Sequence, residues 1–403
     1  MAKTKRTSFA TRAVHTGERT PAGDFTPVST PIQMSVGYLY DSMDEVDAIF
    51  AGTKSGYVYP RYASPTVSAF EEVIADLENG EAAHAFATGM AALHVALLAA
   101  GVKAGSHVVA AFDLYGATFS LLRNLFTTLG AEIHFVDAAD LTGVSEAVER
   151  YKPAALLVET VSNPLLKVAD LEQLAKIARQ YNAQFLVDNT FASPLLVNPL
   201  DFGANYVIHS ATKYIGGHGD LMAGVVVSSK ENRLKMYELN KLIGSTLGPF
   251  EAWLALRGVK TLPLRVRQQC QNAAEIAKWL SVHPKIAKVN YPGLPAHPQH
   301  ALASRQFGGR GYGGMLSFEI EGADKAAAFR FMEKLKLCLP ATTLGDIYSL
   351  VLHPATSSHR ALTAAERAKI GIPDGLIRLS AGIEAVTDII ADLEQALDTV
   401  TGA

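Results

Sequence analysis

Residues 154–190, AALLVETVSNPLLKVADLEQLAKIARQYNAQFLVDNT, contain two apolar runs separated by a segment with a helical pattern. The runs at 154–159 and 184–188 have the length and composition of buried strands, and residues 170–181 have the spacing of a helix. Strands that alternate with helices form a parallel sheet covered on both faces. The segment therefore predicts one unit of an α/β fold.

The same alternation continues on both sides of this segment. Further strands are predicted at 107–112, 132–137, 205–209 and 224–228, with a helix over 116–129. After Gly248-Pro249, a long helical region runs to Ser281 and is followed by predicted strands at 315–320 and 376–381 and a closing helix at 387–397. The predicted fold class is α/β, with a large domain built on a mostly parallel sheet and a smaller α+β domain after it.

These patterns divide the chain into three parts. Residues 1–60 are predicted to be an extended N-terminal arm, because prolines and glycines interrupt every periodic pattern there. The α/β domain spans 61–261 and begins with a helix from Ser64-Pro65 to Asn79-Gly80, with Ser64 as its N-cap. The C-terminal α+β domain spans 262–403.

Composition excludes several classes of protein. The chain is 49% hydrophobic and its net charge is −3, so it can bury a large core and has no basic excess for nucleic acid or an anionic membrane. Its two cysteines, Cys270 and Cys338, form neither a disulfide framework nor a zinc motif, which is typical of a reducing compartment. The N-terminus has no apolar signal region. We therefore expect a cytoplasmic protein without nucleic-acid or membrane partners.

Polar residues follow the predicted strands where an α/β sheet binds its ligands. Asp188 ends one strand, Ser210, Thr212 and Lys213 follow another, and Thr88-Gly89-Met90 begins a helix. Singly, each has an ordinary structural explanation as a turn, loop or cap residue. Together they match one cofactor, because a helix N-terminus binds phosphate, a carboxylate holds a pyridine nitrogen protonated, and a desolvated lysine forms a Schiff base with an aldehyde. These are the three chemical groups of pyridoxal 5'-phosphate (PLP).

Motifs spread over nearly the whole chain strengthen this interpretation. They are YVYPRYASPT (57–66), ATGMAA (87–92), DLYGAT (113–118), VETVSNPLLKVAD (158–170), VDNTFASP (187–194), HSATKYIGGHGD (209–220), LRGVKTLPLR (256–265), HPATSSH (353–359) and LIRLSAGIE (376–384). In this order they resemble the Cys/Met-metabolism family of PLP-dependent enzymes, which includes methionine γ-lyase, cystathionine γ-synthase, cystathionine lyases and O-acylhomoserine sulfhydrylases. The resemblance implies the fold of aspartate aminotransferase (fold type I) and a homotetramer made of two catalytic dimers.

The resemblance also implies roles for the cofactor site. Lys213 would be the Schiff-base lysine, Asp188 the partner of the pyridine nitrogen, and Tyr115 a ring-stacking residue that also serves as acid or base. The residues that would hold the phosphate are Gly89, Met90, Ser210 and Thr212.

Further implied roles concern the substrate and the neighbouring subunit. Arg378 would bind the substrate α-carboxylate as a bidentate fork, assisted by Asn163, with Thr343 nearby. Tyr59 and Arg61 would reach the cofactor phosphate of the neighbouring subunit, which makes the arm an intersubunit element.

The reaction is less narrowly defined by these motifs. His218-Gly219-Asp220 resembles methionine γ-lyase, and Leu344-Gly345-Asp346 resembles both methionine γ-lyase and the sulfhydrylases. Together they predict γ-elimination to 2-oxobutanoate, ammonia and a leaving group. Ala117, Asn240-Lys241 and Tyr348 depart from that pattern. The alternatives are an O-acetyl- or O-succinylhomoserine sulfhydrylase, a cystathionine γ-synthase-type γ-replacement, and a non-catalytic PLP-binding relative, against which the presence of Lys213 argues.

Two other patterns do not predict sites. Gly309-x-Gly311-x-x-Gly314 precedes a strand, whereas a dinucleotide-binding loop follows one. His297, His300, His353 and His359 lack metal-ligand spacing, and Pro298 and Pro354 indicate loops, so no metal site is predicted.

Overall fold

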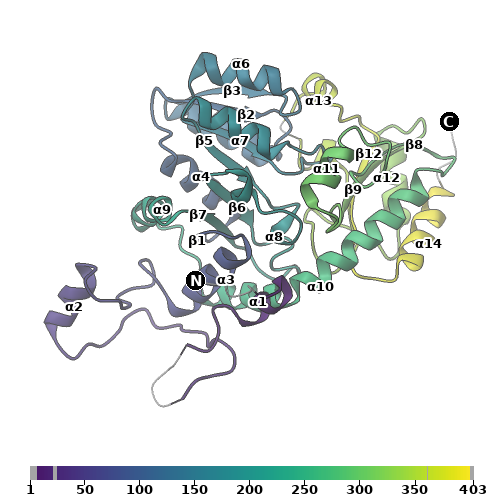
Figure 1. The fold of residues 1–403 in the computed structure, drawn as a ribbon. Helices are drawn as coiled ribbons and strands as arrows, with labels where there is room; N and C mark the ends of the chain where they lie inside the picture. The colour runs from purple at the N-terminus through teal and green to yellow at the C-terminus, as the bar shows by residue number, and fades with distance from the viewer. Residues whose placement is uncertain (1–6, 21–24, 361, 400–403) are drawn as a thin grey trace.

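The computed structural model describes residues 7–20, 25–360 and 362–399, which form two β-sheets bridged by one long helix (Figure 1). The first sheet has seven strands and the second has five. Helix α10 (Pro249–Leu280) passes from one to the other. The predicted α/β class with a smaller second unit is confirmed.

The first sheet has the strand order β1-β7-β6-β5-β4-β2-β3. Strands β6, β5, β4, β2 and β3 pair in parallel, whereas β7 pairs antiparallel with both β6 and β1. The mostly parallel sheet is confirmed, but β1 was not predicted because AAHAF is short and made largely of small residues. The bounds are β1 (Ala82–Phe86), β2 (His107–Ala111), β3 (Glu132–Val136), β4 (Ala155–Glu159), β5 (Gln184–Asp188), β6 (Tyr206–Ser210) and β7 (Gly224–Ser228).

Helices cover both faces of this sheet. Helix α3 packs on β1 and β7, α4 on β6 and β7, α6 on β2 and β3, and α7 on β5. Ser64 stands at the N-cap of α3 as predicted, but its side chain makes no capping hydrogen bond, and its hydroxyl is buried without a hydrogen-bond partner among the described residues. The bounds are α3 (Pro65–Leu77), α4 (Gly89–Ala99), α5 (Gly116–Ser120), a π-helical segment (Leu121–Phe126), α6 (Leu141–Tyr151), α7 (Leu171–Gln180), α8 (Ser193–Leu196), a 3₁₀ turn (Pro199–Phe202) and α9 (Lys230–Ile243).

The second sheet has the order β10-β11-β12-β9-β8 and is antiparallel except between β10 and β11. Its strands are β8 (Ile286–Asn290), β9 (Met315–Ile320), β10 (Leu339–Pro340), β11 (Leu350–Leu352) and β12 (Leu376–Ser380). The elements around it are α11 (His300–Phe307), α12 (Lys325–Lys334), a 3₁₀ turn (Pro354–Thr356), α13 (Ala364–Ile370) and α14 (Val386–Leu397).

Helix α10 contributes to the cores of both sheets. Its first half, including Leu256 and Val259, packs in the core of the first sheet, and Ile276 and Leu280 pack in the core of the second. Gly258 is required where the helix crosses the loop after β6, because a Cβ there would collide with the backbone oxygen of Gly216. The predicted domain boundary at 261/262 falls inside this helix.

The N-terminal segment differs from the extended arm that the sequence predicts. It contains two short helices, α1 (Phe9–His15) and α2 (Met43–Phe50), and residues 1–6 and 21–24 lie outside the described part. Ser42 caps α2 by accepting a hydrogen bond of 3.2 Å from the Glu45 N–H, a signal that the surrounding prolines and glycines obscured.

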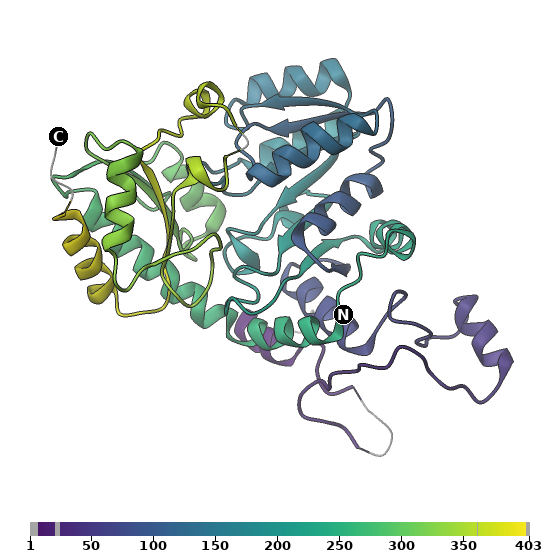
Figure 2. The same cartoon turned by 180° about the vertical axis from the view of Figure 1, so that it is seen from behind.

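Much of this segment projects from the rest of the chain (Figures 1 and 2). Exposed apolar side chains along it are Phe25, Val28, Met34, Val36, Leu39, Met43 and Phe50. Among the described helices, none combines the length and apolar character needed to cross a bilayer.

Candidate functional site

A cavity of about 580 Å³ opens at the carboxyl ends of β4, β5 and β6 and reaches the second sheet. Most of the predicted site residues line it, although they are far apart in sequence. They are Gly89, Met90, Tyr115, Asn163, Asp188, Ser210, Thr212, Lys213 and Arg378. The topology places the ends of the parallel strands at one edge, which gathers most of these residues, and β12 of the second sheet supplies Arg378.

Lys213 lies in the loop after β6 with its amine mostly buried. Its Nζ donates a hydrogen bond of 2.9 Å to Thr343 Oγ1. Burial, together with the positive charge of Arg378, lowers the pKa of Lys213. A lower pKa increases the fraction of neutral amine, the form that attacks carbonyl carbon and accepts protons.

Arg378 comes from β12 and is 3% exposed. Its Nη1 donates a hydrogen bond of 3.1 Å to Asn163 Oδ1, and its Nη2 donates one of 3.1 Å to the Thr343 carbonyl oxygen. Its Nε has no hydrogen-bond partner in the described chain although it is buried. Burial lowers the pKa of Arg378 to about 10, so the guanidinium is charged at neutral pH. A buried charge with an unused donor is suited to an incoming carboxylate.

Asp188 ends β5, and one oxygen of its carboxyl group is fixed by Thr190. Asp188 Oδ1 accepts hydrogen bonds from the Thr190 N–H (3.0 Å) and Oγ1 (2.5 Å). Burial raises the pKa of Asp188, against which the Thr190 hydrogen bonds and the neighbouring His209 act. A cationic partner in the cavity, such as a protonated ring nitrogen, would favour its ionised form.

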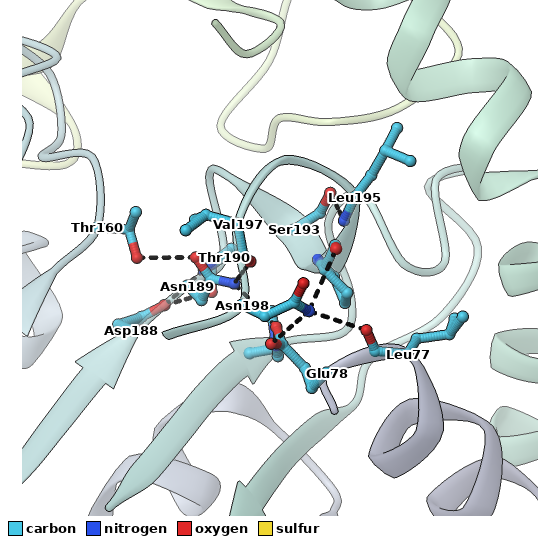
Figure 3. Close-up of polar contacts among 12 residues, drawn as sticks. Leu77, Glu78, Thr160, Asp188, Asn189, Thr190, Ser193, Leu195, Val197 and Asn198 are labelled. Carbon is cyan, nitrogen blue, oxygen red and sulfur yellow. Dashed lines mark hydrogen bonds and ion pairs between the residues drawn. The ribbon is translucent and has the colours of Figure 1, made fainter. Parts of the chain in front are cut away.

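A buried polar network next to Asp188 connects the end of α3 to β5 and β6. Asn189 accepts from the Thr160 hydroxyl over 2.8 Å and donates to Glu78 over 2.8 Å, and Asn198 donates to the same Glu78 over 3.2 Å (Figure 3). Glu78 also pairs with His209 Nε2 at 2.6 Å, with both side chains at most 1% exposed. The network joins the end of α3 to β5 and β6, so the strand ends beneath the cavity are held in place.

Glu159 was quoted in a motif but given no role by the sequence. It ends β4, and its carboxyl group accepts from the Tyr115 N–H over 2.6 Å and from the Asn163 N–H over 3.2 Å. Burial and the nearby Asp188 raise the pKa of Glu159 well above its ordinary value. One buried side chain thus positions the backbone of two predicted site residues. Its place at the end of a strand was the signal that could have identified it.

The start of α4 forms a cradle for an anion. Thr88 caps the helix by accepting from the Ala91 N–H over 3.0 Å, which leaves the first N–H groups, at Gly89 and Met90, free to bind a ligand. A Cβ at Gly89 would lie 2.8 Å from Ser210 Cβ, so only glycine lets the helix approach β6 this closely. The hydroxyl of Thr212 lines the cavity but also accepts from the Ala223 N–H over 3.0 Å.

The residues around the cavity fit PLP. Free N–H groups and the Ser210 hydroxyl suit a phosphate, a carboxyl group suits the ring nitrogen, and Lys213 suits the aldehyde. Lining residues that sequence reasoning did not assign include Thr118, Thr190, Phe191, Met222, Thr342, Ser357 and Ser358.

Thr343 is not among the residues that line the cavity, but it forms hydrogen bonds with both Lys213 and Arg378. Two predicted residues lie elsewhere. Tyr59 is exposed, and Arg61 donates to the Lys241 carbonyl oxygen over 2.8 Å, with its guanidinium 5.3 Å from the Tyr59 ring. Within one chain, neither residue lines the cavity.

Helix α10 holds both sides of the site through residues one turn apart. Arg265 Nη1 donates to the Tyr214 carbonyl oxygen over 2.8 Å, which fixes the loop that carries Lys213. Gln269 Nε2 donates to the Asp346 carbonyl oxygen over 2.7 Å, which fixes the loop that carries Thr343. Both side chains are buried, so one rigid element sets the spacing of the two loops.

Comparisons with known proteins agree with this geometry. The sequence profile of the family described as "Cys/Met metabolism PLP-dependent enzyme" matches residues 10–398. An L-methionine gamma-lyase from Fusobacterium nucleatum subsp. polymorphum is 41% identical over 401 residues, covering 99% of this chain and all of the relative.

Two further similar proteins have different names. A cystathionine beta-lyase from Coxiella burnetii is 41% identical over 396 residues, with 98% of each chain covered. The crystal structure of a cystathionine gamma synthase from Xanthomonas oryzae pv. oryzae, in complex with aminoacrylate and cysteine, superposes with a TM-score of 0.92 at 38% identity, covering 98% of this chain and 99% of that one. The expected fold type I and the PLP cofactor are confirmed. The chain therefore belongs to the Cys/Met-metabolism family of PLP-dependent enzymes.

Proposed function

We propose that this enzyme cleaves the bond between Cγ and its heteroatom in methionine- or homoserine-type amino acids by γ-elimination, releasing 2-oxobutanoate, ammonia and the leaving group. One observation carries the proposal. Thr343 links the Lys213 amine and the Arg378 guanidinium, through its hydroxyl and its carbonyl oxygen respectively. An amino acid whose α-carboxylate bound Arg378 would have its Cα close to Lys213. Identity of 41% to an L-methionine gamma-lyase along the whole chain supports the choice of reaction.

Bound PLP supplies an electron sink for the bonds at Cα. In this proposal Lys213 Nζ holds the cofactor, then takes the proton from Cα and returns it to the substrate. Asp188 pairs with the ring nitrogen. Gly89, Met90, Ser210 and Thr212 hold the phosphate, which is supported by the free N–H groups at the start of α4.

Arg378 binds the α-carboxylate, with Asn163 and Thr343 fixing the plane of the guanidinium. Tyr115 would stack on the cofactor ring and donate the proton that the leaving group needs. Its position at the cavity, with a backbone held by Glu159, supports this role.

A homotetramer of two catalytic dimers completes the proposal. Tyr59 and Arg61 lie outside their own chain's cavity, and the arm exposes a row of apolar side chains, which supports an intersubunit role. We place the enzyme in the cytoplasm, which its two free, buried cysteines support.

A γ-replacement reaction is the second candidate, as in an O-acetyl- or O-succinylhomoserine sulfhydrylase or a cystathionine γ-synthase. Ala117, Asn240-Lys241 and Tyr348, which depart from the methionine γ-lyase pattern, favour it. Elimination and replacement share the residues that bind PLP and the α-carboxylate. The difference between them must lie in how the Cγ substituent and the incoming thiol are held.

A product assay separates these reactions. Purified holoenzyme would be given methionine, homocysteine, cystathionine, O-acetylhomoserine or O-succinylhomoserine, each with and without sulfide. We expect 2-oxobutanoate to form without sulfide, fastest from one sulfur amino acid. If homocysteine forms only with sulfide and an acyl ester, the enzyme is a sulfhydrylase and the γ-lyase proposal is wrong. Absence of any product and of any change in cofactor absorbance would indicate the non-catalytic relative.

A further inference from the structure

Two histidines and a glutamate converge on β2 and β3, away from the catalytic cavity. His107 is the first residue of β2 and pairs directly with Glu132, the first residue of β3. His134 lies two residues after Glu132, so all three side chains project from the same face of the sheet. This group lies at the amino ends of the strands, whereas the cavity lies at the carboxyl ends of the sheet.

The distances within the group match those between ligands of one small metal ion. His107 Nδ1 lies 3.0 Å from His134 Nε2 and 3.5 Å from Glu132 Oε2, and every pair of ligand atoms is within 4.8 Å. A tetrahedral ion with bonds of about 2.0–2.1 Å separates its ligand atoms by about 3.3 Å. The Glu132 side chain is 64% exposed and can rotate to close the remaining edge of the site.

The surroundings orient the histidine rings. The His134 ring stacks on the Tyr151 ring of α6, with centroids 3.5 Å apart and planes 6° from parallel. The His107 ring is 5.8 Å from the same tyrosine.

We propose that His107, Glu132 and His134 bind one divalent transition-metal ion of the zinc type, with water as the fourth ligand. Two imidazoles and one carboxylate suit Zn²⁺ and its neighbours, and not Mg²⁺ or Ca²⁺, which prefer oxygen ligands. The ion would clamp the edge strand β3 to β2. The same contacts also suit a plain hydrogen bond between two imidazoles, with no metal, and the experiment distinguishes these two cases.

The test measures Zn²⁺ affinity of the holoenzyme by competition with a chromophoric chelator. Glu132→Gln keeps the shape of the side chain and removes its charge, and His134→Phe keeps an aromatic ring against Tyr151. His15→Gln, which changes an exposed histidine on α1, is the matched control. We expect one Zn²⁺ per chain whose Kd rises at least tenfold in both site variants and is unchanged in the control. Cofactor absorbance and circular dichroism establish that each variant is folded.

Co²⁺ provides a second readout. In the wild-type holoenzyme we expect visible absorption bands of tetrahedral Co²⁺ that both site variants lose. The proposal is overturned if the wild type binds no Zn²⁺, or if both variants keep the wild-type affinity and the Co²⁺ spectrum. In that case the two histidines share only a hydrogen bond.

Discussion

The backbone N–H of Tyr115 lies 2.6 Å from the carboxyl group of Glu159, so the loop that carries the proposed proton donor is anchored to the end of β4. The same carboxyl group also receives the N–H of Asn163. Glu159 therefore controls the position of residues on two sides of the cavity. It acts through their backbones.

Glu159→Gln should lower kcat about tenfold to a hundredfold, because a glutamine amide has one acceptor oxygen for two N–H donors and one loop must shift. Steady-state kinetics and the visible circular dichroism of the bound cofactor would measure this. Glu172→Gln on the surface of α7 is the control and should match the wild type. An unchanged kcat with an unchanged cofactor spectrum would contradict the positioning role.

Thr343→Val should lower kcat and leave KM nearly unchanged. The substitution removes the hydroxyl that accepts from Lys213 Nζ but keeps the carbonyl oxygen that accepts from Arg378. Kinetics with the best substrate of the panel provide the measurement, and Thr343→Ser, which keeps the hydroxyl, should restore most of the rate. A rise in KM alone would show that this threonine serves the substrate carboxylate and not the lysine.

Arg378→Lys should reduce kcat/KM by about 10- to 150-fold, since a charged hydrogen bond contributes about 1.5–3 kcal/mol and lysine cannot replace the planar fork. The loss should appear mainly in KM and affect every amino acid in the panel. Cofactor absorbance without substrate should stay as in the wild type. Equal KM values for variant and wild type would remove Arg378 from the substrate site.

His359 should make the protein sensitive to mild acid. Burial, then the charge of Arg378, lowers the pKa of His359 to about 4 from an ordinary 6.5. Between these values the unfolded chain binds a proton that the folded chain does not. Its contribution to stability is therefore complete above pH 6.5 and is lost as the pH falls toward 4.

Urea unfolding of the holoenzyme from about pH 7 to about pH 4.5 measures this loss. In His359→Asn the loss should shrink by up to about 3 kcal/mol, because each pKa unit is worth about 1.4 kcal/mol. Part of the loss should remain, because burial also lowers the pKa of His297 to about 4. Identical pH dependence in variant and wild type would show that His359 is not protonated on unfolding.

Arg61→Ala and Lys213→Ala should complement each other if Arg61 serves the neighbouring subunit. Each variant alone should be inactive or nearly so. After joint unfolding and refolding, half of the dimers would be hybrids with one intact site in two, giving about a quarter of wild-type activity. Separately refolded variants mixed afterwards are the control. If the hybrids are inactive, Arg61 acts in its own chain. If Arg61→Ala alone keeps wild-type activity, Arg61 takes no part in catalysis.

The sequence was most informative for residues whose role follows from their position at the end of a strand or the start of a helix. Asp188 ends a strand, Lys213 follows one and Gly89 begins a helix, so strand and helix prediction alone brought them to one edge. Arg378 was different, because it reaches Asn163 across 215 positions through a second sheet whose packing no local pattern encodes. Only the family resemblance identified it.

Other features were missed because their signals are weak or depend on tertiary contacts. Strand β1 consists mostly of small residues, and the short helices α1 and α2 lie among prolines and glycines. Glu159 was missed because its role depends on the backbone N–H groups from which it accepts hydrogen bonds. Those partners are known only once the Tyr115 and Asn163 loops are placed in space.

The long helix α10 has a mechanical consequence for substrate choice. Its two ends pack in the cores of different sheets. Near its middle, Arg265 and Gln269 donate hydrogen bonds to the loops that carry Lys213 and Thr343. The spacing of the loop that carries Lys213 and the loop that carries Thr343 therefore depends on the position of this helix. A substitution at Arg265 or Gln269 is therefore expected to change the fit of the amino acid while every residue that lines the cavity stays the same.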